Sequence, residues 1–330
     1  MKKSFFLPVK RLSSILYIPI MALLALGISR QLNAEITTAL PEASMALSVE
    51  SLRPGEPFAV AYRDDFSGIS GSIHASLYNS GGRRIARAVF FNMPLEEGET
   101  AFMAALLAVP NTAAAGNAVI KIEAGTRVLM EMPITIERRE FNSMTIHLDQ
   151  NNTEIRTAPN PQRTLESEQL WAILATTGRE IYDTGPFILP TESTRRTSLY
   201  GDRRVYVYTG GATDTSIHAG IDIGIPTGTP VMASGRGRVV LARFRIVTGN
   251  TVILEHMPGL YSLYYHMDSI AVSMGDIVEK GAFLGESGST GLSTGPHLHW
   301  EFRVSTEYSD PDAFLYVPLL DKNHLINKLD

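Results

Sequence analysis

Apolar and polar residues alternate with a period of two over much of this chain. The stretch "PFAVAYR" places Phe58, Val60 and Tyr62 on one face of a strand. Two longer stretches each contain two strands around a turn, at residues 79–82 (Asn-Ser-Gly-Gly) and 124–126 (Ala-Gly-Thr). Several short strands at this spacing predict a small β-sandwich of immunoglobulin-like type over residues 45–137.

The pattern changes at residue 138 and returns to strands at about residue 195. Residues 138–194 are expected to be a linker with one short helix, which has Thr164 as its N-cap and Gly178 just beyond its end. From 195 to 318, short apolar strands and tight glycine turns predict an antiparallel β-sheet domain. Residues 319–330 are expected to be a polar C-terminal tail. The predicted fold class is therefore mainly β, in two domains.

The first 34 residues have the layout of a secretory signal peptide. Four basic residues precede an apolar run from 15 to 28, and Leu32-Asn33-Ala34 provides a small-residue cleavage site. The run is short for a membrane span, although an uncleaved anchor is the alternative. We expect export to the periplasm or cell envelope, with membrane contact only through this segment if it stays attached.

The charge and composition of the chain exclude several kinds of partner and metal ligand. The formal net charge is −5, and no lysine- or arginine-rich block offsets it, which argues against nucleic acid as the main partner. Removing residues 1–34, with five basic and no acidic side chains, would bring the charge near −10. The chain has no cysteine, which excludes disulfides, a lipid-modified cysteine and thiolate ligands. Any bound metal must be held by His, Asp or Glu.

Five of the eight histidines lie between residues 218 and 299. In "HLH", His297 and His299 share a face if the segment is a strand, and in "HAGID" His218 and Asp222 are four apart. Catalytic zinc sites use three protein ligands and leave one position for water. His218, Asp222 and one histidine of the HLH pair would complete such a set. The other could move protons, while His266 could hydrogen-bond the water or a developing oxyanion.

The competing interpretation of each histidine is structural. A lone histidine is more often a satisfied buried group than a ligand, so we expect His74, His147 and His256 to be structural and His324 to be solvated. The HLH pair alone could equally be two buried, hydrogen-bonded imidazoles. The full set of motifs in one segment favours a metal site over that reading.

Three segments of the chain, taken in order, carry a resemblance to a known family. They are "HAGIDIGIPTGTPVMASGRGRVV", "GNTVILEHMPGLYSLYYHM" and "GDIVEKGAFLGESGSTGLSTGPHLHWE". Together they resemble the lysostaphin-type, or LytM-domain, zinc metallopeptidases of bacterial cell walls, over about residues 195–318. Upstream, "TSLYGDRRVY" is similar to the opening of that domain, with Tyr200 at a usual aromatic position.

The resemblance assigns roles residue by residue. It implies that His218, Asp222 and His299 are the zinc ligands, with one Zn²⁺ per chain. His297 becomes the catalytic histidine that activates the attacking water, and His266 the second active-site histidine, which supports the transition state. For Glu301 two roles stay open, since it could orient a ligand imidazole or form a salt bridge at the rim.

The function predicted from these residues is a zinc endopeptidase that cleaves peptide cross-links or stem peptides of peptidoglycan. No HExxH glutamate is present, so a histidine must act as the general base, and His297 fits. One alternative is a LytM-type module without catalysis that activates a separate cell-wall amidase. Another gives the main role to the β-sandwich, as an adhesion or scaffold element that could bind an envelope protein.

Overall fold

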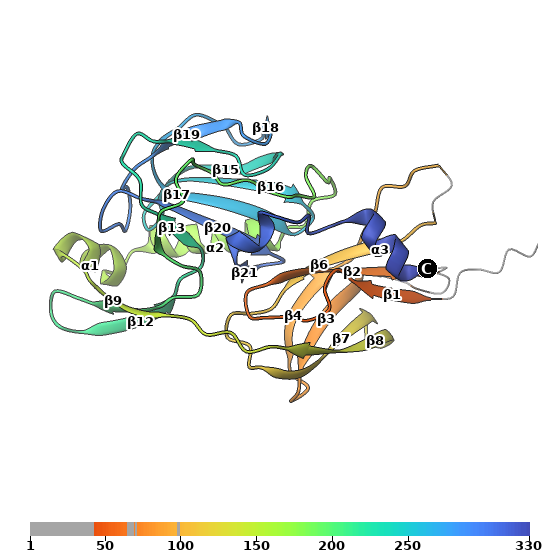
Figure 1. Ribbon diagram of the computed structural model, residues 1–330. Helices are drawn as coiled ribbons and strands as arrows, with labels where there is room; N and C mark the ends of the chain where they lie inside the picture. Colours follow the sequence, from red (N-terminus) through yellow and green to blue (C-terminus); the bar gives the residue numbers. More distant parts are fainter. Residues whose placement is uncertain (1–42, 65–68, 70, 98–99) are drawn as a thin grey trace, which may run out of the picture. The chain divides into compact units, whose positions relative to one another are not determined.

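The computed structural model describes residues 43–64, 69, 71–97 and 100–330 (Figure 1). The expected signal peptide or anchor, residues 1–34, lies outside the described residues. Within the described part, no helix is long and apolar enough to cross a membrane. Most of the regular structure consists of antiparallel strands, which confirms the mainly β prediction.

Two four-stranded antiparallel sheets occupy residues 44–136, in the orders β1-β2-β6-β5 and β4-β3-β7-β8. Phe58 and Val60 of one sheet share a buried cluster with Leu77 and Ile120 of the other. The expected hairpins are confirmed, because β3 pairs with β4 and β7 with β8. An immunoglobulin-like type for this region stays a prediction. The strands are β1 (Ser44–Leu47), β2 (Pro57–Arg63), β3 (Ile73–Asn79), β4 (Arg84–Val89), β5 (Phe91–Asn92), β6 (Met103–Ala108), β7 (Gly116–Ala124) and β8 (Arg127–Ile136).

Strand β2 is buried on both faces, which explains its nearly continuous apolar sequence. Its second face carries Ala59 and Ala61, which belong to the same core cluster as Trp300 and Phe302 of the C-terminal sheet. Small side chains at this face let the two regions approach closely. One core cluster therefore includes residues of both regions, while the N-terminal sheets also have a buried cluster of their own.

A ten-stranded sheet holds the histidine motifs. Its main order is β10-β13-β20-β17-β16-β15-β18. In addition, β19 pairs with both β14 and β17, and β21 pairs with β20. The neighbouring strands β13, β20 and β17 place Asp222 opposite His299, and His299 opposite Tyr265. The strands are β10 (Arg196–Ser198), β13 (Ile221–Ile223), β14 (Pro230–Met232), β15 (Gly237–Arg245), β16 (Gly249–Met257), β17 (Leu260–Ile270), β18 (Ile277–Val278), β19 (Phe283–Ser287), β20 (Leu298–Val304) and β21 (Glu307–Ser309).

The segment expected to be a linker contains more structure than one helix. Strand β9 (Ser143–His147) pairs in parallel with β11 (Arg203–Val207), which pairs antiparallel with β12 (Thr213–Ile217). Helices α1 (Gln150–Thr157) and α2 (Pro161–Ala175) follow, and α2 lies against β15 (Figure 1). Asn160 rather than Thr164 caps α2, because its side chain accepts hydrogen bonds from two N–H groups and Pro161 suits the first helical turn.

The expected polar tail forms a helix. A short 3₁₀ turn (Pro311–Phe314) precedes α3 (Lys322–Leu329), whose Leu325 and Leu329 are buried. The polar composition concealed these two leucines, which are four residues apart and therefore share one helix face. Lys328 donates a hydrogen bond to the carbonyl of Leu47 (3.1 Å), so α3 is held against β1 (Figure 1).

Candidate metal centre

Three side chains bring ligand atoms to one point in the ten-stranded sheet. His218 Nε2 lies 3.1 Å from Asp222 Oδ1 and 3.0 Å from His299 Nδ1, and the third side of this triangle is 2.9 Å. All three residues are buried. In a tetrahedral zinc site with ligand bonds of about 2.0–2.2 Å, the ligand atoms are about 3.3 Å apart. The donor set therefore fits a zinc-sized cation with small adjustments.

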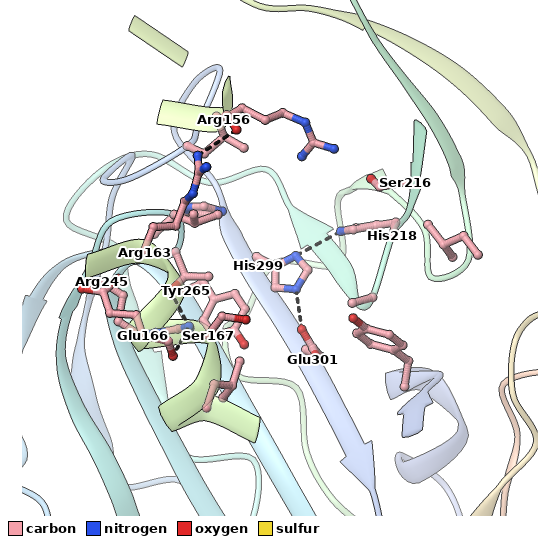
Figure 2. Close-up of a pocket in the computed structure, with 18 of the residues that line it drawn as sticks. Arg156, Arg163, Glu166, Ser167, Ser216, His218, Arg245, Tyr265, His299 and Glu301 are labelled. Atoms are coloured by element: carbon pink, nitrogen blue, oxygen red, sulfur yellow. Dashed lines mark hydrogen bonds and ion pairs between the residues drawn. The ribbon is translucent and has the colours of Figure 1, made fainter. Parts of the chain in front are cut away.

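Hydrogen bonds on the far side of each ring fix which nitrogen faces the centre. His218 Nδ1 donates to the carbonyl oxygen of Leu199 (2.8 Å), which leaves a lone pair on Nε2. His299 Nε2 donates to Glu301 Oε2 (3.2 Å), which leaves a lone pair on Nδ1. Figure 2 shows His299 between His218 and Glu301. With the neutral rings in these tautomers, three lone pairs converge at the centre, an arrangement that a bound cation stabilises.

Electrostatics of the cluster also favour positive charge. Burial alone would lower the pKa of His299, but hydrogen bonds and charges from Asp222 and Glu301 outweigh it and raise that pKa. Burial alone would raise the pKa of Asp222, yet the neighbouring histidines hold it well below its usual range. The carboxylate is therefore ionised and the cluster attracts a cation.

The remaining two histidines of the predicted set lie beside this centre. His297 Nε2 is 3.7 Å from Asp222 Oδ1, and its Nδ1 donates to the carbonyl of Gly295 (2.8 Å). His266 donates from Nδ1 to the carbonyl of Thr290 (2.8 Å), and its ring centre is 4.7 Å from that of His297. Both rings therefore keep Nε2 free of these backbone contacts.

His266 has an unusual backbone conformation. Its φ is +62°, in the left-handed region that residues other than glycine rarely adopt. Burial, together with the nearby His297 and His299, lowers the pKa of His266 to about 3. The ring is therefore neutral near pH 7. Such conformations persist where the surrounding structure holds a side chain in a required place.

Glu301 makes both kinds of contact considered for it from the sequence, a hydrogen bond to a ligand imidazole and a salt bridge. It accepts the hydrogen bond of His299 and forms an ion pair with Arg303, whose guanidinium also lies over the ring of Tyr308. Its side chain is 2% exposed, so the ion pair is buried and not at the rim. Glu301 therefore orients the His299 ring while Arg303 balances its charge.

Arg204 is a contact of the centre that the sequence did not reveal. It lies on β11 and donates to Asp222 Oδ2, the oxygen that does not face the histidines, and to Ser198 Oγ (2.9 Å). The sequence does contain two adjacent arginines in "GDRRVY", and neighbouring residues of a strand face opposite sides. Which arginine reaches the metal centre could not be predicted, because the sequence does not reveal the strand with which β11 pairs.

The other histidines differ from this cluster. His256 is fully buried, with Nδ1 2.8 Å from the carbonyl of Arg236 and Nε2 2.7 Å from Ser262 Oγ. Both of its nitrogens have partners, which agrees with the structural role expected for it. His147 and His324 are exposed and His74 is half-buried, and none of the three belongs to the cluster of potential ligands.

Two cavities adjoin the centre. One of about 580 Å³ contains His218, His266 and His299 in its wall, together with residues of α1 and α2. The other, of about 280 Å³, lies against Asp222 and His297 and is lined by β9 and residues 292–296. The two cavities share lining residues, among them His266 and Leu292, so both lie beside the centre.

A buried cluster of two histidines and an aspartate, with two further histidines at an open cavity, is the architecture of a metal-dependent hydrolase. Comparison with known families agrees. Residues 216–311 match the model of Peptidase family M23, so the chain carries a domain of that family. The match includes all five histidines of the region and Asp222.

Individual relatives match over the same part of the chain. A metalloprotease of Buchnera aphidicola is 40% identical over 96 residues, which is 29% of this chain and 26% of the relative. The peptidoglycan DD-endopeptidase ShyA of Vibrio cholerae is 44% identical over 87 residues, 26% of this chain and 20% of the relative. The chain thus spans about a quarter of the length of these curated relatives or less. The family and these names imply a metal, and His218, Asp222 and His299 have ligand atoms close enough together to hold one.

One solved structure covers more of the chain. A peptidase M23 protein from Pseudomonas aeruginosa aligns with 79% of this chain and 93% of its own, at 21% sequence identity and a TM-score of 0.54. At this identity the likeness concerns the fold. It extends beyond the M23 match, so it includes part of the chain outside residues 216–311.

Proposed function

We propose that this chain is a zinc-dependent endopeptidase that hydrolyses peptide cross-links or stem peptides of bacterial peptidoglycan. The observation that carries the proposal is the convergence of three potential ligand atoms, on His218, Asp222 and His299, at distances of 2.9–3.1 Å from one another. These residues would hold the metal. The peptidoglycan substrate is suggested by the printed activity of the Vibrio cholerae relative.

A bound zinc ion would supply Lewis acidity and bring the pKa of a coordinated water towards about 7. His297 is placed to act as the general base, because Nδ1–H is held by Gly295 and Nε2 is left to accept a proton. After bond cleavage, the same nitrogen would return the proton to the leaving amine.

His266 would have a different task. Its neutral ring is oriented by Thr290, so a proton on Nδ1 leaves Nε2 to accept a hydrogen bond from substrate or water. A change of tautomer is opposed by the carbonyl of Thr290, which can only accept. His266 would therefore orient the attacking group beside His297, 4.7 Å away between ring centres.

Domain roles are part of the proposal. Residues 195–318 would be the peptidase domain, and residues 45–137 an immunoglobulin-like β-sandwich that positions it in the cell envelope. Residues 138–194 contribute β9, α1 and α2 to the cavity walls, so we assign them to the active-site groove. An N-terminal signal peptide would direct the chain to the periplasm.

Digestion of purified peptidoglycan by the full chain tests this proposal. Products would be compared by mass spectrometry with zinc, with a chelator, and with the His297→Ala variant. We expect loss of cross-linked dimers that both the chelator and the substitution abolish. Intact peptidoglycan in the presence of bound zinc would contradict the endopeptidase and favour the module that activates a separate amidase.

A further inference from the structure

The larger cavity beside the metal centre is strongly basic. Its wall contains five arginines and two glutamates (Arg156, Arg163, Arg204, Arg245, Arg303, Glu166 and Glu301). This excess of positive charge contrasts with the chain as a whole, whose formal net charge is −5. A local field of opposite sign to the protein's net charge indicates selection for an anionic ligand group.

Three of the five arginines already have carboxylate partners. Arg303 pairs with Glu301, Arg204 with Asp222, and Arg156 with Asp214. These guanidinium groups are largely committed to structure. One of these ion pairs includes Glu301, a glutamate of the cavity wall. The two other arginines of the wall, Arg163 and Arg245, have no such partner among the described residues.

Arg163 and Arg245 form no ion pair within the described part of the chain. Arg163 lies on α2 and donates from Nη1 to the carbonyls of Ile155 and Arg156, at 2.5 and 2.7 Å. Arg245 ends β15 and donates to Thr248 Oγ1 and to the carbonyl of Glu166, each at 3.1 Å. All of these acceptors are neutral, so neither guanidinium charge is balanced.

The nearby carboxylate of Glu166 forms no ion pair with either arginine, and its negative charge still leaves an excess of one positive charge among the three residues. Its Oε2 accepts from the backbone N–H of Ile246 (2.8 Å) and its Oε1 from Gln162 (3.2 Å). Figure 2 shows Arg163, Arg245 and Glu166 on one side of the pocket and His218 on the other. Glu166 therefore serves to fasten α2 to the end of β15.

Arg245 carries a second indication of a ligand. The residue is only 6% exposed, and its Nε is buried with no hydrogen-bond partner. Burial makes a positive charge without a carboxylate partner costly. Because Arg245 lines the cavity, an anion bound there would offset part of that cost.

We infer that this cavity binds a carboxylate group of the substrate peptide, with Arg163 and Arg245 as the recognising residues. Planar guanidinium groups match carboxylates through paired hydrogen bonds. The inference rests on the proposed function for the nature of the ligand as a peptide. It adds that the enzyme selects peptides whose carboxylate, on a side chain or at a chain end, lies within reach of the scissile bond.

Binding measurements separate this inference from catalysis. The full-length His297→Ala protein, loaded with zinc, would be titrated calorimetrically with soluble peptidoglycan fragments. The same fragments would be used after conversion of their carboxylates to amides. We expect amidation to raise the Kd about tenfold or more, the usual scale for losing a charge-assisted hydrogen bond. Equal affinity for both forms would overturn the inference.

Substitutions of Arg163 then test whether this residue recognises the carboxylate. Arg163→Gln in the same background should weaken binding of the carboxylate form about tenfold and leave the amide form unchanged, with Arg163→Lys in between. Gln keeps a donor for the carbonyls at the end of α1, and circular dichroism would check the fold. Arg87→Gln, an exposed arginine of β4, is the matched control. Equal weakening of both forms by Arg163→Gln would show a structural role and contradict the assignment.

The outcomes for the two proposals are distinguishable. Carboxylate discrimination in binding, together with failure of the wild-type chain to hydrolyse peptidoglycan, would sustain the inference and refute the endopeptidase. Hydrolysis that proceeds equally on free and amidated fragments would sustain the endopeptidase and refute the inference.

Discussion

A single buried histidine and the metal centre, both in the region of the ten-stranded sheet, show the difference between a satisfied polar group and a binding site. His256 on β16 has a partner for each nitrogen, a carbonyl on one side and a hydroxyl on the other. At the metal centre, the outer nitrogens of His218 and His299 are equally well paired, but their inner nitrogens face each other and Asp222. Both sites are buried. They differ in that His256 has a hydrogen-bond partner for each nitrogen, whereas the potential ligand atoms of the mismatched cluster, His218, Asp222 and His299, face one another and favour a bound cation.

The largest effect should come from removing one ligand of the mismatched cluster. In the full chain, Asp222→Ala or His299→Ala should reduce bound zinc from one per chain to none and lower activity by on the order of 10³-fold or more, because Lewis acidity is lost. Metal content by mass spectrometry and peptidoglycan turnover measure the two effects. Retention of stoichiometric zinc in both variants would remove these residues from the ligand set.

Replacing His297 should lower turnover without affecting zinc binding. His297→Ala removes the assigned general base and no ligand, so zinc content should stay at one per chain while kcat falls about 10²–10⁴-fold. The readouts are the same two assays, performed on one protein preparation. Full activity in this variant would contradict the role of His297, and loss of zinc would make it a ligand.

His256 should affect stability but not catalysis. Burial lowers its pKa from 6.5 to about 4, so the folded chain keeps it neutral where the unfolded chain takes up a proton. The free energy of unfolding should therefore fall as the pH drops from 6.5 towards 4, by up to about 3 kcal/mol from this group. Urea unfolding across this range, compared between the wild type and His256→Gln, measures it.

In that comparison, His256→Gln should flatten the decline because it removes the titrating group and keeps one donor and one acceptor. Its zinc content at pH 7 should equal that of the wild type, since His256 lies away from the metal centre. An identical pH dependence in the two proteins would show that other groups cause the acid sensitivity.

The smallest effect should come from the hydrogen bond behind His299. Glu301→Gln retains an acceptor but removes the charge that favours the His299 orientation, so zinc affinity should fall about 10- to 100-fold. Competition with a chromogenic chelator measures the Kd. Glu131→Gln, an exposed glutamate of β8, is the control. Unchanged affinity would leave Glu301 with the sole task of pairing Arg303.

The parts of the structure that local patterns determine could be predicted from the sequence. The hairpins at residues 79–82 and 124–126 follow from turn residues between alternating strands, and both are present. The motifs predicted His218, Asp222 and one histidine of the HLH pair as ligands, and the family resemblance chose His299; these three side chains do converge. For the hairpins, the deciding information lies within a few neighbouring residues.

Long-range pairings could not be predicted in the same way. Strand β9 has an ordinary polar alternation, and its parallel partner β11 is about 60 residues away. The contact of Arg204 with Asp222 depends on that pairing and on the placement of β13. Likewise, α3 appeared to be a polar tail because its two buried leucines become meaningful only beside β1 and β2. Such contacts arise from the packing of distant segments.

Three of the site's imidazoles are oriented by main-chain carbonyls, those of Leu199, Thr290 and Gly295. A carbonyl is present whatever the side chain, so these anchors place no demand on residue type. Substitutions at the three anchor positions can accumulate over evolutionary time without disturbing ring orientation, provided the backbone path is kept. Sequence drift in these loops is therefore compatible with an unchanged centre, and divergence there would be a poor guide to loss of activity.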